Sequence, residues 1–377
     1  MAEVTPTTTS FSALTDATRS LGQTVTWRFV IVILCLAALW GAASFLTRTA
    51  HEQRVTRAEA AAALAAFAQA GGRREDAVAL YREAASLEPR QPGYRLALAK
   101  ALVAVGRPTE AEPYVREVLR LDPVNGEANL VLARIFEQAG SRDDAEHTYY
   151  RAIYGRWAPA AQPLRTVARL ELIEHYRRRG ERMRLRAALL ELSSAFPGDR
   201  ELQLQAGRDL LAEGFNDDAA RQLRVVAERF ADADDAVALL AKAEFARRNY
   251  VEAYAAAGRV LAEDTRNQEM TALRVLTARI LALDPDQRRL PMKERLSRLR
   301  LLLSEVRGHL GRCDAGADVA TLRPPIEQWL TRQSTDFDLG RTLLEAAARR
   351  MPPTCLPSAE GSAVGRLLAD LASESAR

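Results

Sequence analysis

Apolar residues recur every three or four positions along much of this 377-residue chain. Residues at that spacing lie on one face of a helix, so the pattern predicts amphipathic helices that each bury one face. Two examples are the stripe of Leu98, Leu102 and Val105 and the stripe of Leu132, Ile135 and Phe136. The sequence therefore predicts an all-α fold.

The helical pattern also repeats along the chain. Residues 75–89 read EDAVALYREAASLEP, and residues 109–123, 34 positions later, read TEAEPYVREVLRLDP. A unit of this size is too small to bury its own apolar face and must stack on a neighbour. We therefore expect a stacked array in which each unit is a helical hairpin.

Single residue types recur with the same period and mark the hairpins. A glycine, which can adopt the left-handed conformation, ends the first helix of each unit, and an alanine follows in the second helix. The two columns are Gly72, Gly106, Gly140, Gly180 and Gly214, and Ala77, Ala111, Ala145, Ala219 and Ala253. Small residues in the first helices are expected to face this alanine column and let the backbones approach, namely Ala65, Ala99, Ala133 and Gly207. One extra step of six residues falls at residues 155–164, GRWAPAAQPL, which predicts a loop.

These columns resemble the tetratricopeptide repeat. Its order of small residue, Gly turn, Ala, aromatic, Ala and Pro is matched by Ala65, Gly72, Ala77, Tyr81, Ala84 and Pro89, and in the third unit by Ala133, Phe136, Gly140, Ala145, Tyr149 and Ala152. The match is strong for residues 58–157, weaker for 166–264, where Ile173 and Leu185 replace small residues, and poor beyond. The resemblance implies a right-handed superhelix of antiparallel helix pairs, whose groove is lined by the first helices and holds segments of partner proteins.

Four segments follow from this organisation. Residues 1–26, rich in Thr and Ser, predict a flexible tail. Residues 27–48 predict a transmembrane helix, and residues 49–264 about six repeats. Residues 265–377 predict a degenerate repeat and a helical cap, with a long helix in 291–310 and further helices at 325–333, 336–350 and 362–374. An independent small domain is the alternative for this last segment.

The membrane segment is FVIVILCLAALWGAASFL, residues 29–46, which has no charge and lies between Arg28 and Arg48. As a helix it spans roughly 27 Å, about one hydrocarbon core. A cleaved signal peptide is the alternative, because residues 42–44 are small. The long leader favours an uncleaved anchor. Ala37 and Gly41 form a small-xxx-small pair that predicts dimerisation of the anchor.

The orientation of the anchor is not decided by charge, because Arg residues lie on both sides of the span. Cys313 and Cys355 would close a disulfide in an oxidising periplasm, adding roughly 3 to 4 kcal/mol in the chain-entropy model, or they are two free thiols. With the usual plan of bacterial single-span proteins, we expect a protein of the bacterial inner membrane whose soluble region is periplasmic.

Composition and motifs argue against catalysis. The charges nearly balance, with 53 Lys and Arg against 49 Asp and Glu, and the four His are scattered. The sequence has no nucleotide-binding loop, zinc motif or nucleophile elbow. We therefore predict that the protein binds no cofactor and no metal and is not an enzyme. The run RRRGERMRLR, residues 177–186, lacks an aromatic platform, so we expect no nucleic acid there. Two interpretations of residues 177–186 remain. The run contacts an anionic lipid or an acidic protein, or it is a solvated turn.

The register of the resemblance predicts which residues line the groove. The ninth place of successive units falls on Lys100, Arg134, Glu174 and Arg208, and the fifth on Leu96, Leu130, Leu170 and Leu204. Leucines beside cations suit an amphipathic or acidic partner segment. The alternative is that the leucines belong to the core between repeats and that the cations are merely solvated.

These observations lead to three hypotheses of function. The first is a non-enzymatic, membrane-anchored scaffold of the bacterial envelope that holds protein partners in its groove, similar in layout to ancillary translocon and envelope-assembly proteins. The second is a regulatory or co-polymerase subunit of an exopolysaccharide or secretion machine, whose C-terminal helices make the specific contact. The third is a hydrolase within residues 267–377.

Overall fold

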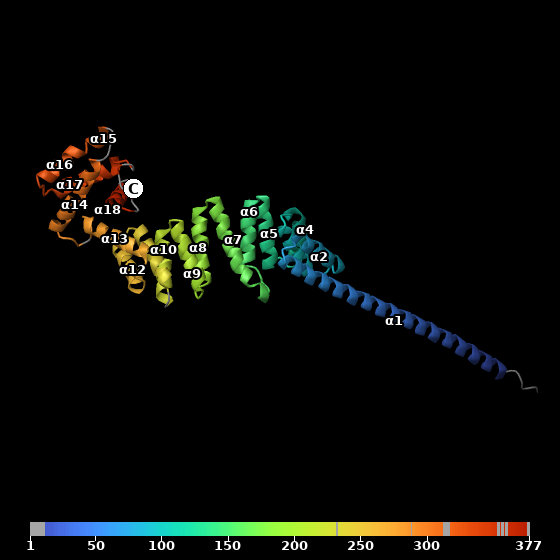
Figure 1. Ribbon diagram of the computed structural model, residues 1–377. Coiled ribbons are helices and arrows are strands. Elements are labelled where there is room, and N and C mark those ends of the chain that lie inside the picture. Colours follow the sequence, from blue (N-terminus) through green and yellow to red (C-terminus); the bar gives the residue numbers. More distant parts are fainter. Residues whose placement is uncertain are drawn as a thin grey trace, which may run out of the picture. The chain divides into compact units, whose positions relative to one another are not determined.

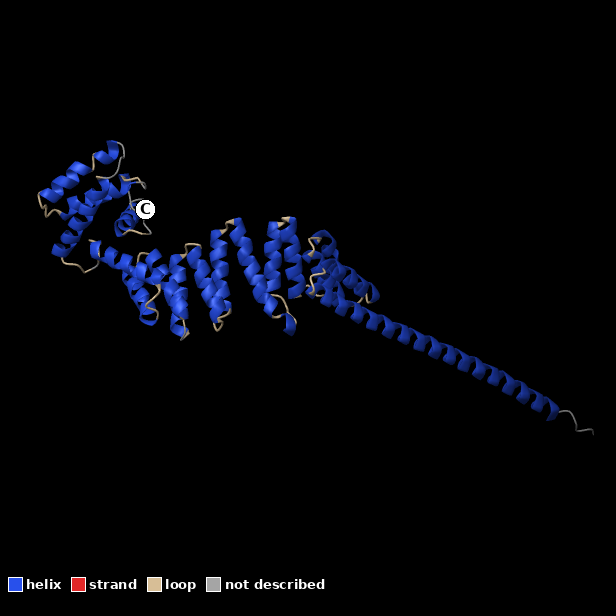
Figure 2. Cartoon of the chain, in the orientation of Figure 1, coloured by secondary structure: helices blue, strands red, loops and turns tan. Residues whose placement is uncertain are grey.

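The computed structural model describes residues 12–230, 233–287, 289–311, 317–352, 355, 358 and 361–374. Helices form all the regular structure of these residues, and they contain no strand (Figure 2). The predicted all-α array of helix pairs is thereby confirmed. The chain divides into two compact units, residues 1–172 and 173–377, whose boundary falls within α7 (Pro163–Arg179).

The first unit holds a long N-terminal helix followed by short helices that pack pairwise in chain order (Figure 1). Its helices are α1 (Ser12–Ala70), α2 (Arg74–Leu87), α3 (Pro92–Ala104), α4 (Pro108–Leu121), α5 (Gly126–Ala139), α6 (Arg142–Ile153) and the 3-10 helix η1 (Pro159–Ala161). The small residues predicted to face one another are completely buried, namely Ala65, Ala77, Ala99, Ala111, Ala133 and Ala145. Each hairpin therefore closes through contact between small side chains.

Helix α1 begins well before the first repeat. It includes residues 12–26, for which the sequence predicts a flexible tail, and residues 1–11 lie outside the described residues. Once nucleated, a helix gains one hydrogen bond for each added residue, and no proline interrupts this stretch. In the described part of the chain, one helix is long and apolar enough to cross a membrane, and its apolar stretch from Val32 is not buried.

The predicted loop at residues 155–164 is fixed against the start of α5. The Gly126 amide donates to the Arg156 carbonyl (2.8 Å), and the Trp157 indole donates to the Ala152 carbonyl (2.9 Å). A Cβ on Gly126 would lie 2.3 Å from the indole nitrogen, so this position needs glycine. The added residues are thus held by a buried tryptophan.

The second unit begins within α7 and continues with eleven further helices among its described residues. They are α8 (Arg182–Ala195), α9 (Arg200–Ala212), α10 (Asn216–Arg229), α11 (Asp234–Ala246), α12 (Tyr250–Glu263), α13 (Gln268–Leu283), α14 (Met292–Leu310), α15 (Ala317–Ala320), α16 (Arg323–Thr331), α17 (Phe337–Arg350) and α18 (Ala363–Glu374). Helices α16, α17 and α18 lie close to their predicted bounds. Leu299, Leu303 and Val306 of α14 are fully buried in one core with Leu367 and Leu368 of α18.

The turns within the hairpins share one backbone conformation. The five glycines of the predicted column have positive φ angles between 68° and 78°. A sixth turn, one repeat period after Gly214, has the same conformation at Arg248, with φ 66°. The repeat therefore continues through α11 and α12 although the glycine is absent.

Two of the three cysteines are among the described residues, and they differ in their bonding state. Cys35 is free and exposed, whereas Cys355 is half-buried and disulfide-bonded. Cys313 lies outside the described residues, so its pairing with Cys355 stays a prediction.

Candidate functional site

In the first unit, the predicted ninth-place cations are paired with carboxylates of the next first helix. Lys100 Nζ lies 2.6 Å from Glu127 Oε1. Arg134 holds Glu171 with two nitrogens, Nη2 at 2.6 Å from Oε1 and Nε at 3.0 Å from Oε2. The hydrogen bond from Arg134 to Glu171 raises the pKa of the guanidinium. These cations therefore join successive repeats before any partner binds.

The fifth-place leucines lie mostly in the core. Leu96, Leu130 and Leu204 are 9%, 1% and 1% exposed, and Leu170 is half-buried. Leu96, for example, belongs to the same buried cluster as Val131 of the next hairpin. Leu96, Leu130 and Leu204 thus correct the prediction of an accessible leucine row, because a partner cannot contact side chains that are almost fully covered.

In the second unit, one of the two predicted ninth-place residues is paired with a charged side chain and the other is not. Glu174 accepts a hydrogen bond from Arg177 (2.7 Å), which also binds Glu213 (2.8 Å) and Asp209 (3.3 Å). The hydrogen bond to Glu213, followed by that to Glu174, raises the pKa of Arg177. Arg208, by contrast, is exposed, and no described residue forms an ion pair or hydrogen bond with its side chain. It is the predicted site residue that keeps an unpaired charge.

The sequence register contains a signal for this pairing. Lys242 lies one repeat period after Arg208 and thus also at a ninth place. Lys100 and Lys242 are each followed by a carboxylate at the same spacing along the chain, in the pairs Lys100–Glu127 and Lys242–Glu269, the latter at 2.7 Å. The same spacing from Arg208 leads to Asp235, but Arg200 already binds that carboxylate (2.5 Å). Arg208 thus has no ion pair among the described residues, while a cation from the start of its own helix binds the carboxylate at that spacing.

The basic run at residues 177–186 is largely neutralised within the protein. Arg179 lies 2.5 Å from Glu181, and Arg184 lies 3.2 Å from the same carboxylate. Arg186 and Arg221 both bind the buried carboxylate of Asp218, and the Arg186 guanidinium lowers the pKa of that group. The run therefore braces neighbouring helices, which makes it a poor site for a polyanion.

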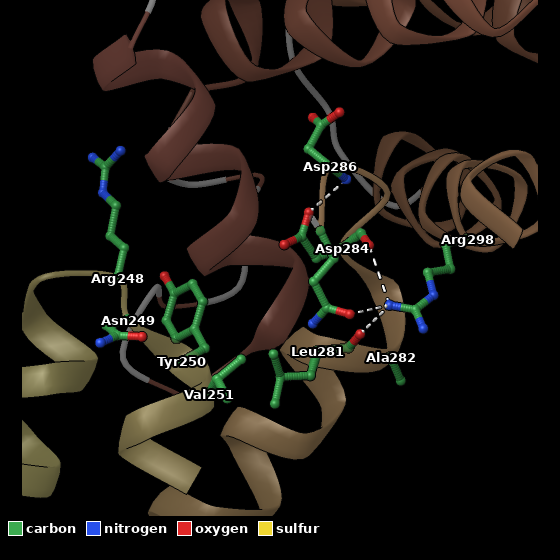
Figure 3. A pocket seen from close by; sticks show the side chains of 10 residues that line it. Arg248, Asn249, Tyr250, Val251, Leu281, Ala282, Asp284, Asp286 and Arg298 are labelled. Atoms are coloured by element: carbon green, nitrogen blue, oxygen red, sulfur yellow. Dashed lines mark hydrogen bonds between the residues drawn. The ribbon is translucent and has the colours of Figure 1, made fainter. Parts of the chain in front are cut away.

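An open pocket of about 730 Å³ lies between the turn after α11, the end of α13 and α14 (Figure 3). The Asp284 carboxylate accepts a hydrogen bond from the Asp286 amide (2.9 Å), and Arg298 Nη1 donates to the Leu281 carbonyl (2.6 Å) and to Gln287 Oε1 (2.9 Å). Burial, rather than a neighbouring charge, is the main cause of the raised pKa of Asp284. The polar groups that line the pocket bind one another. The pocket wall therefore presents few unpaired charges to a ligand.

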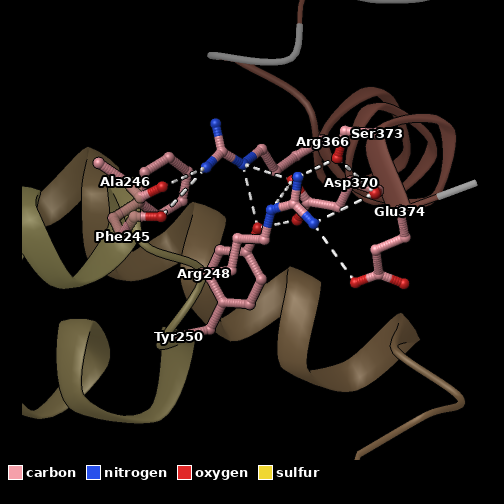
Figure 4. Close-up of polar contacts among 8 residues, drawn as sticks. All are labelled: Phe245, Ala246, Arg248, Tyr250, Arg366, Asp370, Ser373 and Glu374. Atoms are coloured by element: carbon pink, nitrogen blue, oxygen red, sulfur yellow. Dashed lines mark hydrogen bonds and ion pairs between the residues drawn. The ribbon is translucent and has the colours of Figure 1, made fainter. Parts of the chain in front are cut away.

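Beside the pocket, α18 is attached to the sixth turn by a polar cluster that we call the C-terminal clasp, consisting of Arg248, Tyr250, Arg366 and Asp370 (Figure 4). Asp370 Oδ1 lies 3.0 Å from Arg248 Nε and 3.5 Å from Arg366 Nε, and Asp370 Oδ2 accepts from the Tyr250 hydroxyl. Arg366 also donates to the Phe245 carbonyl (3.1 Å), at the end of α11. Sequence analysis missed this cluster, because its members come from two distant parts of the chain.

Among the described residues, no group of three or more His, Cys, Asp or Glu side chains is placed to hold a metal ion.

The comparisons with known proteins agree with the repeat pattern. Residues 96–161 match the family model described as tetratricopeptide repeat, so this segment carries tetratricopeptide repeats. Proteins with such repeats act as scaffolds for protein–protein interaction. No curated protein matches the sequence.

Solved structures with a similar fold have low sequence identity to the chain. Pseudomonas aeruginosa pilF is 14% identical, with a TM-score of 0.38, over 59% of this chain and 99% of that one. PilW, a type IV pilus biogenesis factor, is 18% identical, with a TM-score of 0.36, over 57% and 96%. YrrB, a repeat protein with an unusual peptide-binding site, is 15% identical, with a TM-score of 0.37, over 52% and 98%.

Proposed function

We propose that the protein is a non-enzymatic scaffold anchored in a membrane, which presents its repeats to a protein partner. The observation that carries the anchor is the continuity of α1. The described side chains of its apolar stretch, from Val32 on, are not buried, and the same helix supplies Ala58, Ala61, Ala65 and Ala68, which are buried against the first repeat. No loop separates the two parts, so one continuous helix joins the first repeat to the proposed anchor.

The location that fits this proposal is the bacterial inner membrane, with the repeats on the periplasmic side. The bonded state of Cys355 supports it, because disulfides persist in oxidising compartments and are rare in the cytosol.

Extraction of membranes at alkaline pH tests the anchor, since an integral protein stays in the pellet. Protease added to intact spheroplasts tests the side, and digestion of the repeats is expected. Full protection of the repeats from the protease would show that they lie on the cytoplasmic side instead.

The partner contact proposed for the second unit centres on Arg208. It is exposed and unpaired among the described residues, and a cation of that kind on a first helix suits an acidic group on the partner. A photoreactive amino acid at position 208 of the full chain is expected to crosslink one protein. The same amino acid at Val225, which is 46% exposed on the second helix of the same hairpin, serves as the matched control. Equal crosslinking from both positions would contradict the assignment.

A second candidate is a regulatory subunit whose C-terminal helices contact the partner. The pocket of about 730 Å³ favours it, because Val251 lines the pocket and is 58% exposed. Crosslinking from Val251 but not from position 208 would support this candidate over the first. Crosslinking from position 208 alone would exclude it.

A further inference from the structure

One face of α1 stays uncovered where the helix runs beside the repeats. The buried face of its last three turns consists of alanines. Another side carries Ala60, Ala63, Leu64 and Phe67, of which Leu64 is 57% and Phe67 is 70% exposed. The guanidinium of Arg73 lies 5.9 Å from the centre of the Phe67 ring. A terminal helix of a stacked array normally presents a polar outer face, so this apolar side needs an explanation.

Toward the anchor, the uncovered side continues through uncharged residues, apolar at Leu46, Ala60, Ala63 and Phe67 and polar at Thr49, Gln53 and Thr56. Leu46, Gln53, Ala60 and Phe67 fall on every seventh position, and Thr49, Thr56 and Ala63 stand at the third position after each of the first three. These are the a and d positions of a coiled coil, and we call them the α1 seam. The ionisable side chains between residues 47 and 60 all lie outside the seam, namely Arg48, His51, Glu52, Arg54, Arg57 and Glu59. The seam therefore has no charge from Leu46 to Phe67.

Charges at the edge of the seam indicate what covers it. Glu52 and Arg57 occupy a g position and the e position of the following heptad. In a parallel pair of helices, these positions face each other across the seam, so Glu52 of each copy would meet Arg57 of the other. Neither side chain forms an ion pair or side-chain hydrogen bond with the described residues of its own chain. Both are free for a contact between copies.

We infer that the α1 seam binds the same seam of a second copy in a parallel dimer. The parallel direction rests on the proposed anchor, because two chains inserted in the same membrane point the same way. The repeats pack on the alanine face of α1 and leave the seam clear, so both arrays remain accessible. This interface also differs from the small-residue pair Ala37 and Gly41, which lies on another side of the helix.

Crosslinking of the full-length protein in its native membrane tests the seam. Cys35, which is free and exposed, falls in the same heptad register and is first changed to Ser, and the dimer yield of this variant, which keeps Cys313 and Cys355, is subtracted as the background. On that background, Gln53→Cys places a thiol on the seam and Arg54→Cys places one on the adjacent side as the matched control. We expect oxidation to give at least tenfold more disulfide-linked dimer from position 53 than from position 54. Equal yields would overturn the inference.

The charged edge gives a second, independent test. Glu52→Arg and Arg57→Glu each place like charges across the dimer and are expected to lower the yield from position 53 several-fold. The double variant restores opposite charges and is expected to restore the yield. Single variants without effect, or a double variant no better than either, would show that the two residues do not meet.

The same samples separate this inference from the proposed anchor. Protein that is released by alkaline extraction yet crosslinks at position 53 would refute the anchor and keep the dimer. Protein that stays in the membrane but does not crosslink would refute the dimer and keep the anchor.

Discussion

Five turns of the array carry glycine, and the sixth carries arginine with the same backbone. At Gly140 the next amide, of Ser141, donates to the Phe136 carbonyl (2.9 Å), and at Arg248 the amide of Asn249 donates to the Glu244 carbonyl (2.8 Å). A residue with a Cβ in this conformation costs about 1–2 kcal/mol. The comparison shows that the packing of the hairpin imposes the turn and that glycine only lowers its cost.

The two kinds of turn differ in what lies beside them. Nothing lies within 4 Å of a Cβ built on Gly72, Gly106 or Gly140, so those turns face open space. The Arg248 side chain binds the Asp370 carboxylate, the Asp370 carbonyl (3.2 Å) and Glu374 Oε1 (3.3 Å). The cost of the sixth turn is therefore offset by contacts that fix α18 to the repeats.

The largest effect is expected from Asp370→Ala, which removes the carboxylate that three members of the clasp share. Arg366 would then lose its carboxylate partner while partly buried, and Arg248 would keep only the exposed Glu374, at a cost of about 3 kcal/mol. Hydrogen exchange of the α18 amides is expected to accelerate by about two orders of magnitude, because about 1.4 kcal/mol corresponds to tenfold. Glu374→Ala removes an exposed carboxylate and serves as the control, with little change expected. Equal effects of the two variants would contradict the clasp.

Arg248→Ala and Arg248→Gly separate the strain of the turn from the contacts of the side chain. Both variants lose the ion pairs with α18, but only glycine also relieves the left-handed conformation. We expect Arg248→Ala to destabilise the docking of α18 by about 2 kcal/mol and Arg248→Gly by about 1 kcal/mol. Hydrogen exchange in the turn and in α18 measures both values. An Arg248→Gly protein more stable than the wild type would mean that the contacts of the Arg248 side chain contribute less than the backbone strain that glycine relieves.

A smaller effect is expected at a regular turn. Gly106 has φ +76°, and its Cβ would meet no atom, so Gly106→Ala introduces backbone strain without a clash. The expected cost is about 1 kcal/mol in urea unfolding. Gly93→Ala, in the helix α3 that leads to the same turn, also has free space and is expected to stabilise by up to about 1 kcal/mol. The two substitutions should therefore shift the midpoint in opposite directions.

The fold was predictable from the sequence because small residues and turns are local requirements. Ala99 and Ala111 are needed where two helices touch, and Gly106 is needed where the chain turns, so their period is visible without coordinates. The sixth turn was missed in the glycine column, since arginine is no signal for a positive φ. Ala253, one repeat period after Ala219, marked its hairpin nevertheless.

The candidate site was predictable only in part, because it depends on contacts between distant residues. The register placed Lys100 and Arg134 on first helices but did not show that Glu127 and Glu171 neutralise them. It also placed Leu130 beside them without showing that this side chain is covered. The clasp joins residues 248 and 370 across 122 positions, and no local pattern specifies such a pair.

The smallest effect is expected from the pH dependence of the pocket beside the sixth turn. Burial raises the pKa of Asp284 above its ordinary value of 3.8. For an acid whose pKa is raised on folding, the stabilising contribution is complete below the unfolded pKa and is lost as the pH rises through the folded pKa. The wild type should therefore lose stability relative to Asp284→Asn as the pH increases from about 4, and thermal unfolding measures this difference. A difference that is constant with pH would mean that Asp284 titrates as it does in the unfolded chain, and the pocket wall would then be more hydrated than its half-buried carboxylate implies.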